Sequence, residues 1–487
     1  MRRFTFVAPL LIFACAPAGH ERSENHVELE ACQLQTPGLT TRVAAQCGTW
    51  PVFENRKAGA GRRIELRVAV VPAVSRNPMP DPLVFLTGGP GQAATETYVS
   101  VASAFRTIHQ ERDIVLVDQR GTGSSNPLRC PKPDDTTELW LLDDETMGSW
   151  VSRCLSELDA DPRFYTTSIA MEDLDEIRDA LGYERVNLYG ISYGTRAALA
   201  YLRQFPDRVR SVILDGIAPP TEALGLDVAR DAQRAFDLLV ARCENDVSCR
   251  DAFGSLEDDL EALMARVATP VDVTLRHPRT GETETLALKR SMAAFAVRLL
   301  TYSQETASLV PLLLRTAAGG DLAPIAAQFL MTSGQVEETI SDAMGFSVIC
   351  SEDFPFLDES EIVAHNEGTY LGAVQTDSLK KLCPLWPRGD IPADFKKPVH
   401  SDVPVLLLSG EADPVTPPSN GELVASSLTN ALHLVARGQG HMVIHRGCIP
   451  RLAAELVEAG TLDALDVACV EDIEPLPFFM SFAGPLP

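Results

Sequence analysis

The stretch Val186-Asn187-Leu188-Tyr189-Gly190-Ile191-Ser192-Tyr193-Gly194 decides the fold, because it joins an apolar run to a helical pattern through a serine between two glycines. Residues 186–189 predict a buried strand, and residues 195–204 predict a helix that ends near Pro206. A serine in this position adopts a strained turn, and side chains at the two glycine positions would collide with the adjoining strand and helix. The stretch therefore predicts a serine hydroxyl exposed above a sheet, at the positive end of the following helix.

Strands alternate with helices on both sides of this turn. Helical spacing is found over 98–111 and again from Ser168 to Gly182, where the glycine ends the helix. Apolar strands are expected at 64–71, 83–86, 114–118 and 209–214. This alternation predicts the α/β class, with a mostly parallel sheet and helices on both of its faces.

The rhythm breaks between residues 219 and 397, where the apolar spacing is mainly helical. A hairpin is expected there, with strands at 271–275 and 283–288. The strand pattern resumes at 403–408 and 431–435 and is followed by a helix around 450–458. We therefore expect a helical lid (219–397) inserted between two parts of one core domain, residues 31–218 and residues 398–487.

The N-terminus has the pattern of an export signal. Residues 1–14 combine two arginines with an apolar run too short to span a bilayer. The run ends Ile12-Phe13-Ala14-Cys15, which resembles the bacterial lipobox and predicts a lipid on Cys15, with residues 15–30 as a polar tether. The alternative is an ordinary signal peptide with an incidental cysteine. Either reading predicts an exported protein, and the lipobox favours anchoring in the bacterial periplasm or cell envelope.

Ten cysteines remain besides Cys15, and an even number in an exported chain indicates disulfides. Connectivity cannot be deduced from the sequence, although nearest-neighbour pairing would close five local loops. Buried free thiols are the alternative. No C-x-x-C spacing occurs and no histidines cluster with the cysteines, so neither a metal nor another cofactor is expected. The ten are Cys32, Cys47, Cys130, Cys154, Cys243, Cys249, Cys350, Cys383, Cys448 and Cys469.

Charge and composition exclude several classes of protein. The 487 residues carry 67 acidic and 42 basic side chains, which gives a formal charge of −25. Nucleic acid is an unsuitable partner for such a chain, because its binding depends on lysine and arginine. No stretch after the N-terminus approaches the ~18 apolar residues of a membrane helix. We expect a peptide or small molecule as the substrate, with a lipid anchor as the sole membrane contact.

A serine hydroxyl needs a base to become a nucleophile, and the base needs an acid to orient it. In folds of this kind the acid follows the serine in the chain and the histidine follows the acid. Asp413 comes after the strand 403–408, and His441 comes after the strand 431–435. Ser192, Asp413 and His441 are therefore the predicted triad. Glu411 is the rival acid, and Thr416 is expected to support the Asp413 loop through a hydroxyl bond to the backbone, or else to cap a helix.

An oxyanion in such a reaction is stabilised by backbone N–H groups. Glycine lets the backbone approach the oxyanion closely, and residues 88–91 read Gly-Gly-Pro-Gly directly after the strand 83–86. We expect one donor from this loop, at Gly89. The residue after the nucleophile, Tyr193, is the expected second donor.

Six stretches together resemble the prolyl/tripeptidyl aminopeptidase family of α/β-hydrolases, in its secreted tripeptidyl branch. The resemblance extends over about residues 50–470. It implies the α/β-hydrolase fold, release of amino acids or short peptides from free N-termini, and Ser192, Asp413 and His441 as the triad. Thr87 departs from the histidine usual in prolyl aminopeptidases, which weakens a strictly proline-releasing activity. The stretches are Thr87-Gly88-Gly89-Pro90-Gly91, Asp118-Gln119-Arg120-Gly121-Thr122-Gly123-Ser124, Gly190-Ile191-Ser192-Tyr193-Gly194, Leu214-Asp215-Gly216, Asp413-Pro414-Val415-Thr416-Pro417 and Gly440-His441.

An exopeptidase of this fold must stabilise the ammonium group of its substrate, and the lid is the natural source of a carboxylate. Glu352 and Asp353 follow Cys350 and an apolar segment, so we expect one of them to bind the substrate N-terminus. An exposed acidic turn is the alternative. Two other functions stay open, namely an esterase or amidase acting on small molecules, and a membrane-anchored binding protein without catalysis.

Overall fold

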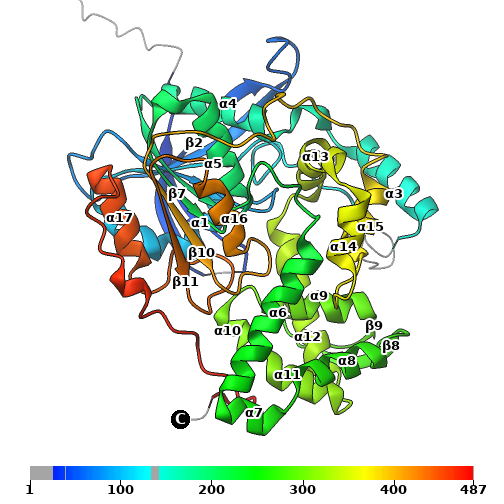
Figure 1. Ribbon diagram of the computed structural model, residues 1–487. Coiled ribbons are helices and arrows are strands. Elements are labelled where there is room, and N and C mark those ends of the chain that lie inside the picture. Colours follow the sequence, from blue (N-terminus) through cyan, green and yellow to red (C-terminus); the bar gives the residue numbers. More distant parts are fainter. Residues whose placement is uncertain (1–25, 39, 133–141, 486–487) are drawn as a thin grey trace, which may run out of the picture.

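The structure is a computed structural model that describes residues 26–38, 40–132 and 142–485. The predicted signal peptide (1–14), Cys15 and most of the predicted tether lie outside the described residues. A nine-stranded sheet forms the centre, with helices packed against both of its faces (Figure 1). The fold class predicted from the sequence is confirmed.

The sheet is mixed, and its parallel part contains the serine-bearing strand. The strand order is β1-β2-β3-β5-β4-β6-β7-β10-β11, antiparallel from β1 to β5 and parallel from β5 to β11. Most central strands are buried along their whole length, as expected for parallel strands covered on both faces. The strands are β1 (Glu30–Gln35), β2 (Arg42–Phe53), β3 (Arg63–Val71), β4 (Leu83–Leu86), β5 (Ile114–Val117), β6 (Val186–Ile191), β7 (Val209–Asp215), β10 (Val405–Gly410) and β11 (Ala431–Ala436).

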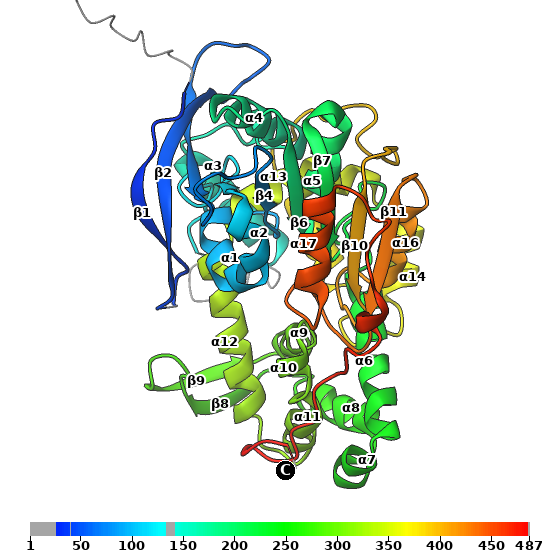
Figure 2. The ribbon, with the colours of Figure 1, turned by 90° about the vertical axis from the view of Figure 1, so that its left-hand side faces the viewer.

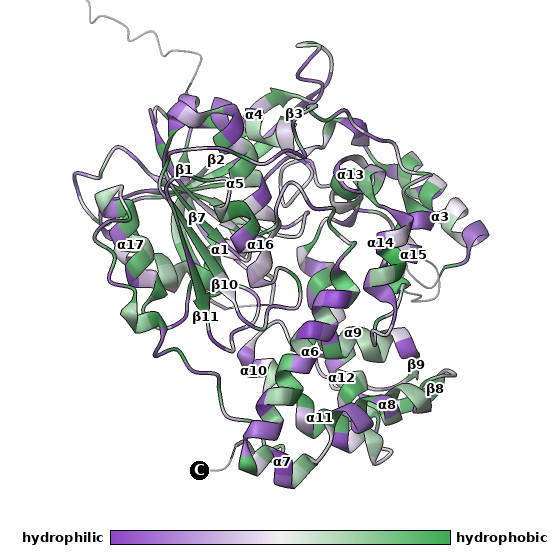
Figure 3. Ribbon diagram, in the orientation of Figure 1, coloured by the Kyte–Doolittle hydropathy of each residue, from purple (hydrophilic) through white to green (hydrophobic). Residues whose placement is uncertain are grey.

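Two apolar clusters, one on each face, hold the helices to the sheet. One face is covered by α1 (Ala94–Val101), α2 (Arg106–Glu111) and α17 (Ile449–Ala459), which lie in front of the sheet in Figure 2. The other face is covered by α3 (Asp144–Glu157), α4 (Thr167–Ala180), α5 (Tyr193–Gln204) and α16 (Pro418–Ala425). Figure 3 shows hydrophobic residues concentrated on the central strands, which form the core between these layers.

The sequence pattern does not predict the antiparallel hairpin β1–β2. The predicted tether, residues 15–30, also extends into residues that belong to the folded core. Val27, inside the predicted tether, is 2% exposed and packs in the core, and its N–H donates to the Ala180 carbonyl. Glu30 already belongs to β1. The Cys32–Cys47 disulfide joins β1 to β2. The polar composition of this region concealed a hairpin that is held by a covalent bond and by pairing of β2 with β3.

Ten helices and a hairpin lie between β7 and β10 in the described chain. Helices α6 to α12 and the hairpin share a separate apolar cluster. These elements form the lower part of Figure 1. In contrast, α13 and α15 pack against the cluster that covers the sheet. The elements are α6 (Val228–Asn245), α7 (Val247–Phe253), α8 (Leu256–Arg266), β8 (Val271–Arg276), β9 (Thr283–Leu288), α9 (Arg290–Leu300), α10 (Gln304–Ala307), α11 (Val310–Ala318), α12 (Ala323–Thr339), α13 (Asp342–Glu352), α14 (Glu359–Asn366) and α15 (Val374–Leu382).

All ten described cysteines form disulfides, and each is paired with its nearest neighbour in the sequence. Free thiols are thereby excluded for these residues. The described chain contains no helix long and apolar enough to cross a membrane. The pairs are Cys32–Cys47, Cys130–Cys154, Cys243–Cys249, Cys350–Cys383 and Cys448–Cys469.

Candidate active site

Ser192 lies in a strained turn between β6 and α5, as the sequence predicts. Its backbone has φ 56° and ψ −127°, a left-handed conformation that costs a non-glycine residue about 1–3 kcal/mol. Two contacts oppose this cost: the Ser192 N–H donates to the Asp215 carbonyl over 2.9 Å, and the Thr195 hydroxyl donates to the Ser192 carbonyl over 2.6 Å. The sharp turn presents Ser192 at the carboxyl edge of the parallel strands.

The two glycines beside Ser192 are required by the close approach of other chain segments. A Cβ at Gly190 would lie 2.4 Å from the Gly194 carbonyl oxygen, and a Cβ at Gly194 would lie 2.2 Å from the Leu86 carbonyl oxygen. Both distances are far shorter than a van der Waals contact. Gly194 thus lets α5 begin directly against the end of β4, which brings the loop after β4 next to the serine.

Asp413 and His441 form a hydrogen bond at the ends of neighbouring strands. Asp413 Oδ2 lies 2.8 Å from His441 Nδ1, and the aspartate side chain is fully buried. Its Oδ1 accepts the backbone N–H groups of Val415 and Thr416 at 2.8 and 2.9 Å. The Thr416 hydroxyl donates to Asp413 Oδ2 over 2.8 Å, so Thr416 supports the loop through the carboxylate and not through the backbone. Both oxygens of the Asp413 carboxylate therefore accept hydrogen bonds, which fixes the orientation of the side chain.

Glu411, the rival acid, forms hydrogen bonds with groups other than the histidine. Glu411 Oε2 accepts the backbone N–H of Gly438 over 2.7 Å, and the Glu411 carbonyl accepts the guanidinium of Arg234. Glu411 therefore stabilises the turn after β11, whereas Asp413 contacts the histidine ring.

The pKa values of the pair move in opposite directions. Burial alone would raise the pKa of Asp413, but the adjacent His441 and the hydrogen bonds to its carboxylate outweigh burial and lower that pKa. Burial alone would lower the pKa of His441, but the Asp413 carboxylate outweighs burial and raises that pKa above the ordinary 6.5. The pair therefore favours an ionised aspartate that stabilises a charged imidazolium.

Gly216 lies between the serine turn and the histidine ring. A Cβ at Gly216 would be 2.8 Å from His441 Cε1, and the preceding residue, Asp215, bonds the backbone of Ser192. The ring of His441 is also in edge-to-face contact with Tyr302, at 5.5 Å between centroids. The backbone N–H of His441 donates to the Tyr302 carbonyl over 2.7 Å. Ser192, Asp413 and His441 therefore converge on one end of the sheet.

The carboxylate of Asp215 fixes the chain just after His441. It accepts the N–H groups of Val443 and Ile444 at 2.8 and 2.9 Å and the Tyr189 hydroxyl at 2.9 Å. Burial raises the pKa of Asp215 to about 6. The sequence contained this residue within a family-like stretch but gave no sign of its role, because the contacts join segments more than 200 residues apart.

The glycine loop after β4 lies beside the serine. A Cβ at Gly88 would be 3.0 Å from the Ser192 Cβ, and Gly89 has φ 107°, a conformation that favours glycine. Tyr193 is the first residue of α5, so its backbone N–H has no acceptor within the helix. These positions are where the predicted donors, Gly89 and Tyr193, are expected to act.

Glu352 and Asp353 are fully buried, which excludes the exposed acidic turn. The Glu352 carboxylate accepts both the N–H and the hydroxyl of Thr167, at 2.6 and 2.7 Å, and the Thr167 hydroxyl also contacts the Tyr193 hydroxyl at 2.6 Å. Burial, together with the neighbouring Asp353, raises the pKa of Glu352 to about 7. Glu352 is thus connected to the residue that follows the serine.

Asp353 has a different environment from its neighbour. Its Oδ1 forms ion pairs with Arg196 at 2.7 Å and with Lys396 at 3.1 Å, and it accepts the Leu224 N–H. Two cations therefore already neutralise Asp353, whereas Glu352 has only neutral donors among its hydrogen-bond partners. The described residues hold no group of acidic, histidine or cysteine side chains suited to a metal ion.

As the pH is lowered, activity should be lost at a higher pH than a histidine with an unshifted pKa would give. A base acts in its neutral form, and the Asp413 carboxylate raises the pKa of His441, so kcat/KM should rise with pH through an inflection above 6.5. The sequence alone places this loss below about pH 6. A pH profile of kcat/KM between pH 5 and 9 measures it, and a flat profile would argue against His441 as the base.

Family models match both parts of the core. Residues 81–252, which include Ser192, match the α/β hydrolase fold, and residues 368–469, which include Asp413 and His441, match the TAP-like protein family.

Curated proteins resemble the chain over most of its length. The serine protease Hip1 of Mycobacterium tuberculosis is 26% identical over 483 residues, covering 91% of each chain. A tripeptidyl aminopeptidase of Streptomyces coelicolor is 23% identical over 466 residues, covering 89% of this chain and 84% of that protein. A putative hydrolase of Escherichia coli, YuaR, is 22% identical and covers 78% of both chains. The chain is therefore an α/β-hydrolase with a TAP-like carboxyl-terminal region, and it is similar over most of its length to proteins named as serine peptidases.

Proposed function

We propose that the protein is an exported aminopeptidase that releases amino acids or short peptides, tripeptides foremost, from free peptide N-termini. The observation that carries the proposal is the buried Asp413–His441 hydrogen bond of 2.8 Å beside the strained turn of Ser192. A relative named as a tripeptidyl aminopeptidase, similar over 89% of this chain, supports the length of the released peptide.

In the proposed reaction the Ser192 hydroxyl attacks the scissile carbonyl while His441 accepts its proton. Asp413 holds the ring with Nε2 toward the serine and stabilises the imidazolium that forms. The N–H groups of Gly89 and Tyr193 stabilise the oxyanion, and one such donor contributes about 3 kcal/mol. His441 then protonates the leaving amine, and water hydrolyses the acyl-enzyme by the same route.

Glu352 is the proposed partner of the substrate ammonium group. Its pKa of about 7 means that an approaching cation favours the ionised carboxylate at neutral pH. Its hydrogen bonds run through Thr167 to Tyr193, beside the nucleophile. The ion pairs of Asp353 with Arg196 and Lys396 favour Glu352 over Asp353 for this role.

Wild-type enzyme should hydrolyse a tripeptidyl reporter amide with a free amine at least tenfold faster than its N-acetylated form. The ammonium group loses its charge on acetylation, so the attraction to Glu352 is lost. Glu352→Gln should narrow this ratio by raising KM for the free substrate. Glu361→Gln, at an exposed position in α14, is the matched control and should leave the ratio unchanged.

Equal hydrolysis of the two substrates by wild type would exclude the aminopeptidase proposal. It would favour the alternative, an esterase or amidase that acts on small molecules through the same triad. A comparison with p-nitrophenyl esters separates the two, since the aminopeptidase should prefer the peptide amide. A ratio unaffected by Glu352→Gln would exclude only the role of Glu352.

Export and lipidation of Cys15 are part of the proposal. Five disulfides in the described chain support an oxidising compartment outside the cytoplasm. Cys15→Ser should therefore abolish labelling by a palmitate analogue and move the protein from the membrane to the soluble fraction. Labelling that persists in this variant would rule out the lipobox.

A further inference from the structure

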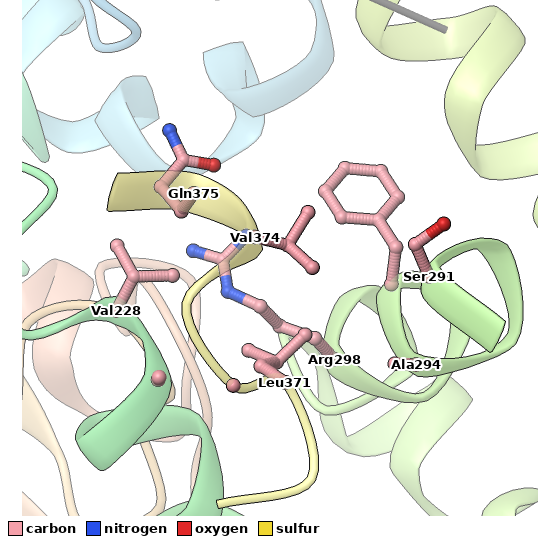
Figure 4. Close-up of a pocket in the computed structure, with 10 residues that line it drawn as sticks. Val228, Ser291, Ala294, Arg298, Leu371, Val374 and Gln375 are labelled. Atoms are coloured by element: carbon pink, nitrogen blue, oxygen red, sulfur yellow. The ribbon is translucent and has the colours of Figure 1, made fainter. Parts of the chain in front are cut away.

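A pocket lies within the inserted region, between α6, α9 and the segment that leads into α15 (Figure 4). Its walls are mainly aliphatic, with one aromatic ring. The polar side chains on its lining are those of Arg298, Gln375 and Ser291. None of the lining residues is acidic, so Arg298 gives the pocket a positive charge.

Arg298 is an unusual cation because it is buried without a carboxylate partner. Its side chain is 8% exposed, and its Nε has no hydrogen-bond partner. Among the described residues, no aspartate or glutamate forms an ion pair with Arg298, and its guanidinium carbon lies over the Tyr302 ring at 5.3 Å. A buried charge of this kind is unfavourable unless it is paired, so a binding anion would stabilise it.

A second polar group nearby is also without a partner. The Tyr370 hydroxyl is buried and forms no hydrogen bond. Tyr370 does not itself line the pocket, but the residue that follows it, Leu371, does. Among the described residues, no side chain accepts a hydrogen bond from this hydroxyl or from the Nε of Arg298.

The pocket lies close to the catalytic histidine. Tyr302 contacts His441 at 5.5 Å between ring centroids, and the guanidinium carbon of Arg298 lies 5.3 Å from the centre of the Tyr302 ring. The two distances place the guanidinium carbon no more than about 11 Å from the centre of the His441 ring. An extended peptide spans about 3.3–3.6 Å per residue, so this distance corresponds to about three residues.

We propose that this pocket is a subsite that binds a carboxylate of the peptide substrate, through Arg298 with help from Tyr370. The carboxylate belongs either to an acidic side chain or to the C-terminus of a short peptide, and the apolar walls pack against the adjoining methylene groups. The proposal rests on the proposed peptidase function. The overall charge of −25 opposes anion binding, so a preference for anionic peptides would have to originate locally.

Binding to the Ser192→Ala variant tests the subsite without depending on turnover. The probes are alanine pentapeptides with a free amine. One arm compares glutamate with glutamine at each position of peptides that end in an amide, and the other compares a C-terminal acid with the amide. Calorimetry should give a Kd at least tenfold lower for the anionic member in one arm, and the arm identifies the source of the carboxylate.

In the Ser192→Ala background, Arg298→Met should reduce the ratio of the two Kd values to less than twofold. Arg276→Met, which replaces an exposed arginine of the hairpin, should leave this ratio unchanged. The proposal is wrong if no pair differs more than twofold, or if the difference survives Arg298→Met. Failure of the wild type to cleave any of these peptides would instead overturn the proposed peptidase function. The two failures can be distinguished, because peptide binding is measured separately on Ser192→Ala.

Two further readouts separate a binding role from a structural one. Because Arg298 lacks an ion-pair partner, Arg298→Met should keep or raise the Tm of the free protein, whereas a structural arginine would lower it. Tyr370→Phe preserves the ring and should raise KM for the anionic substrate. A fall in Tm with Arg298→Met and unchanged KM with Tyr370→Phe would contradict the subsite.

Discussion

Replacing Ser192 with alanine should lower kcat by about 10⁶-fold, since removal of the nucleophile from a triad leaves only substrate binding and oxyanion stabilisation. The Ser192 hydroxyl sits at a turn between β6 and α5, and its side chain forms no hydrogen bond with the residues that the structure describes. The backbone contacts to Asp215 and Thr195 persist in the variant. The expected Tm is therefore within a few degrees of wild type.

A fluorophosphonate probe provides the matching measurement on the nucleophile. Wild type should be labelled at Ser192, as identified by mass spectrometry of the modified peptide, and Ser192→Ala should not be labelled. Ser149→Ala, at an exposed position in α3, is the control for a serine-to-alanine change and should be labelled normally. Labelling that survives Ser192→Ala would refute the assignment.

Asp413→Asn should lower kcat by about 10⁴-fold with little change in KM, because an amide no longer holds His441 in the tautomer that can accept the serine proton. The carboxylate is also what raises the pKa of His441, and burial acts in the opposite direction. Residual activity in Asp413→Asn should therefore show an inflection below pH 6.5, in contrast to the inflection above 6.5 in wild type.

Glu411→Gln is the control for this change, and it should alter kcat less than threefold. Its side-chain oxygen can still accept the N–H of Gly438, and it does not contact the histidine. A severe loss in Glu411→Gln with a mild loss in Asp413→Asn would reverse the choice of acid.

Local patterns in the sequence were sufficient to predict the parallel part of the sheet. They also indicated the strand ends after which Ser192, Asp413 and His441 lie. Strand β4 is an unbroken apolar run that a glycine loop follows, and β6 is apolar apart from Asn187 and Gly190, so their positions can be read from local composition. Each predicted triad residue follows such a strand, and parallel strands bring their carboxyl ends to one edge. The convergence of Ser192, Asp413 and His441 follows from this arrangement.

Features that depend on tertiary contact were not predictable. The hairpin β1–β2 has a weak apolar alternation, and the Cys32–Cys47 disulfide and its pairing with β3 compensate for this. The bonds of Asp215 to the chain after His441, and those of Glu352 to Thr167, join segments separated by 185 to 229 residues. No local pattern records such distances. The unpaired state of Arg298 is likewise visible only when the whole surroundings of the side chain are known.

Product identification on an unmodified heptapeptide tests the central claim most directly. Wild type should release the N-terminal tripeptide first and leave the N-acetylated peptide intact, while Ser192→Ala should release nothing, as followed by mass spectrometry over time. Cleavage at internal bonds with equal rates for the free and the acetylated peptide would contradict the account.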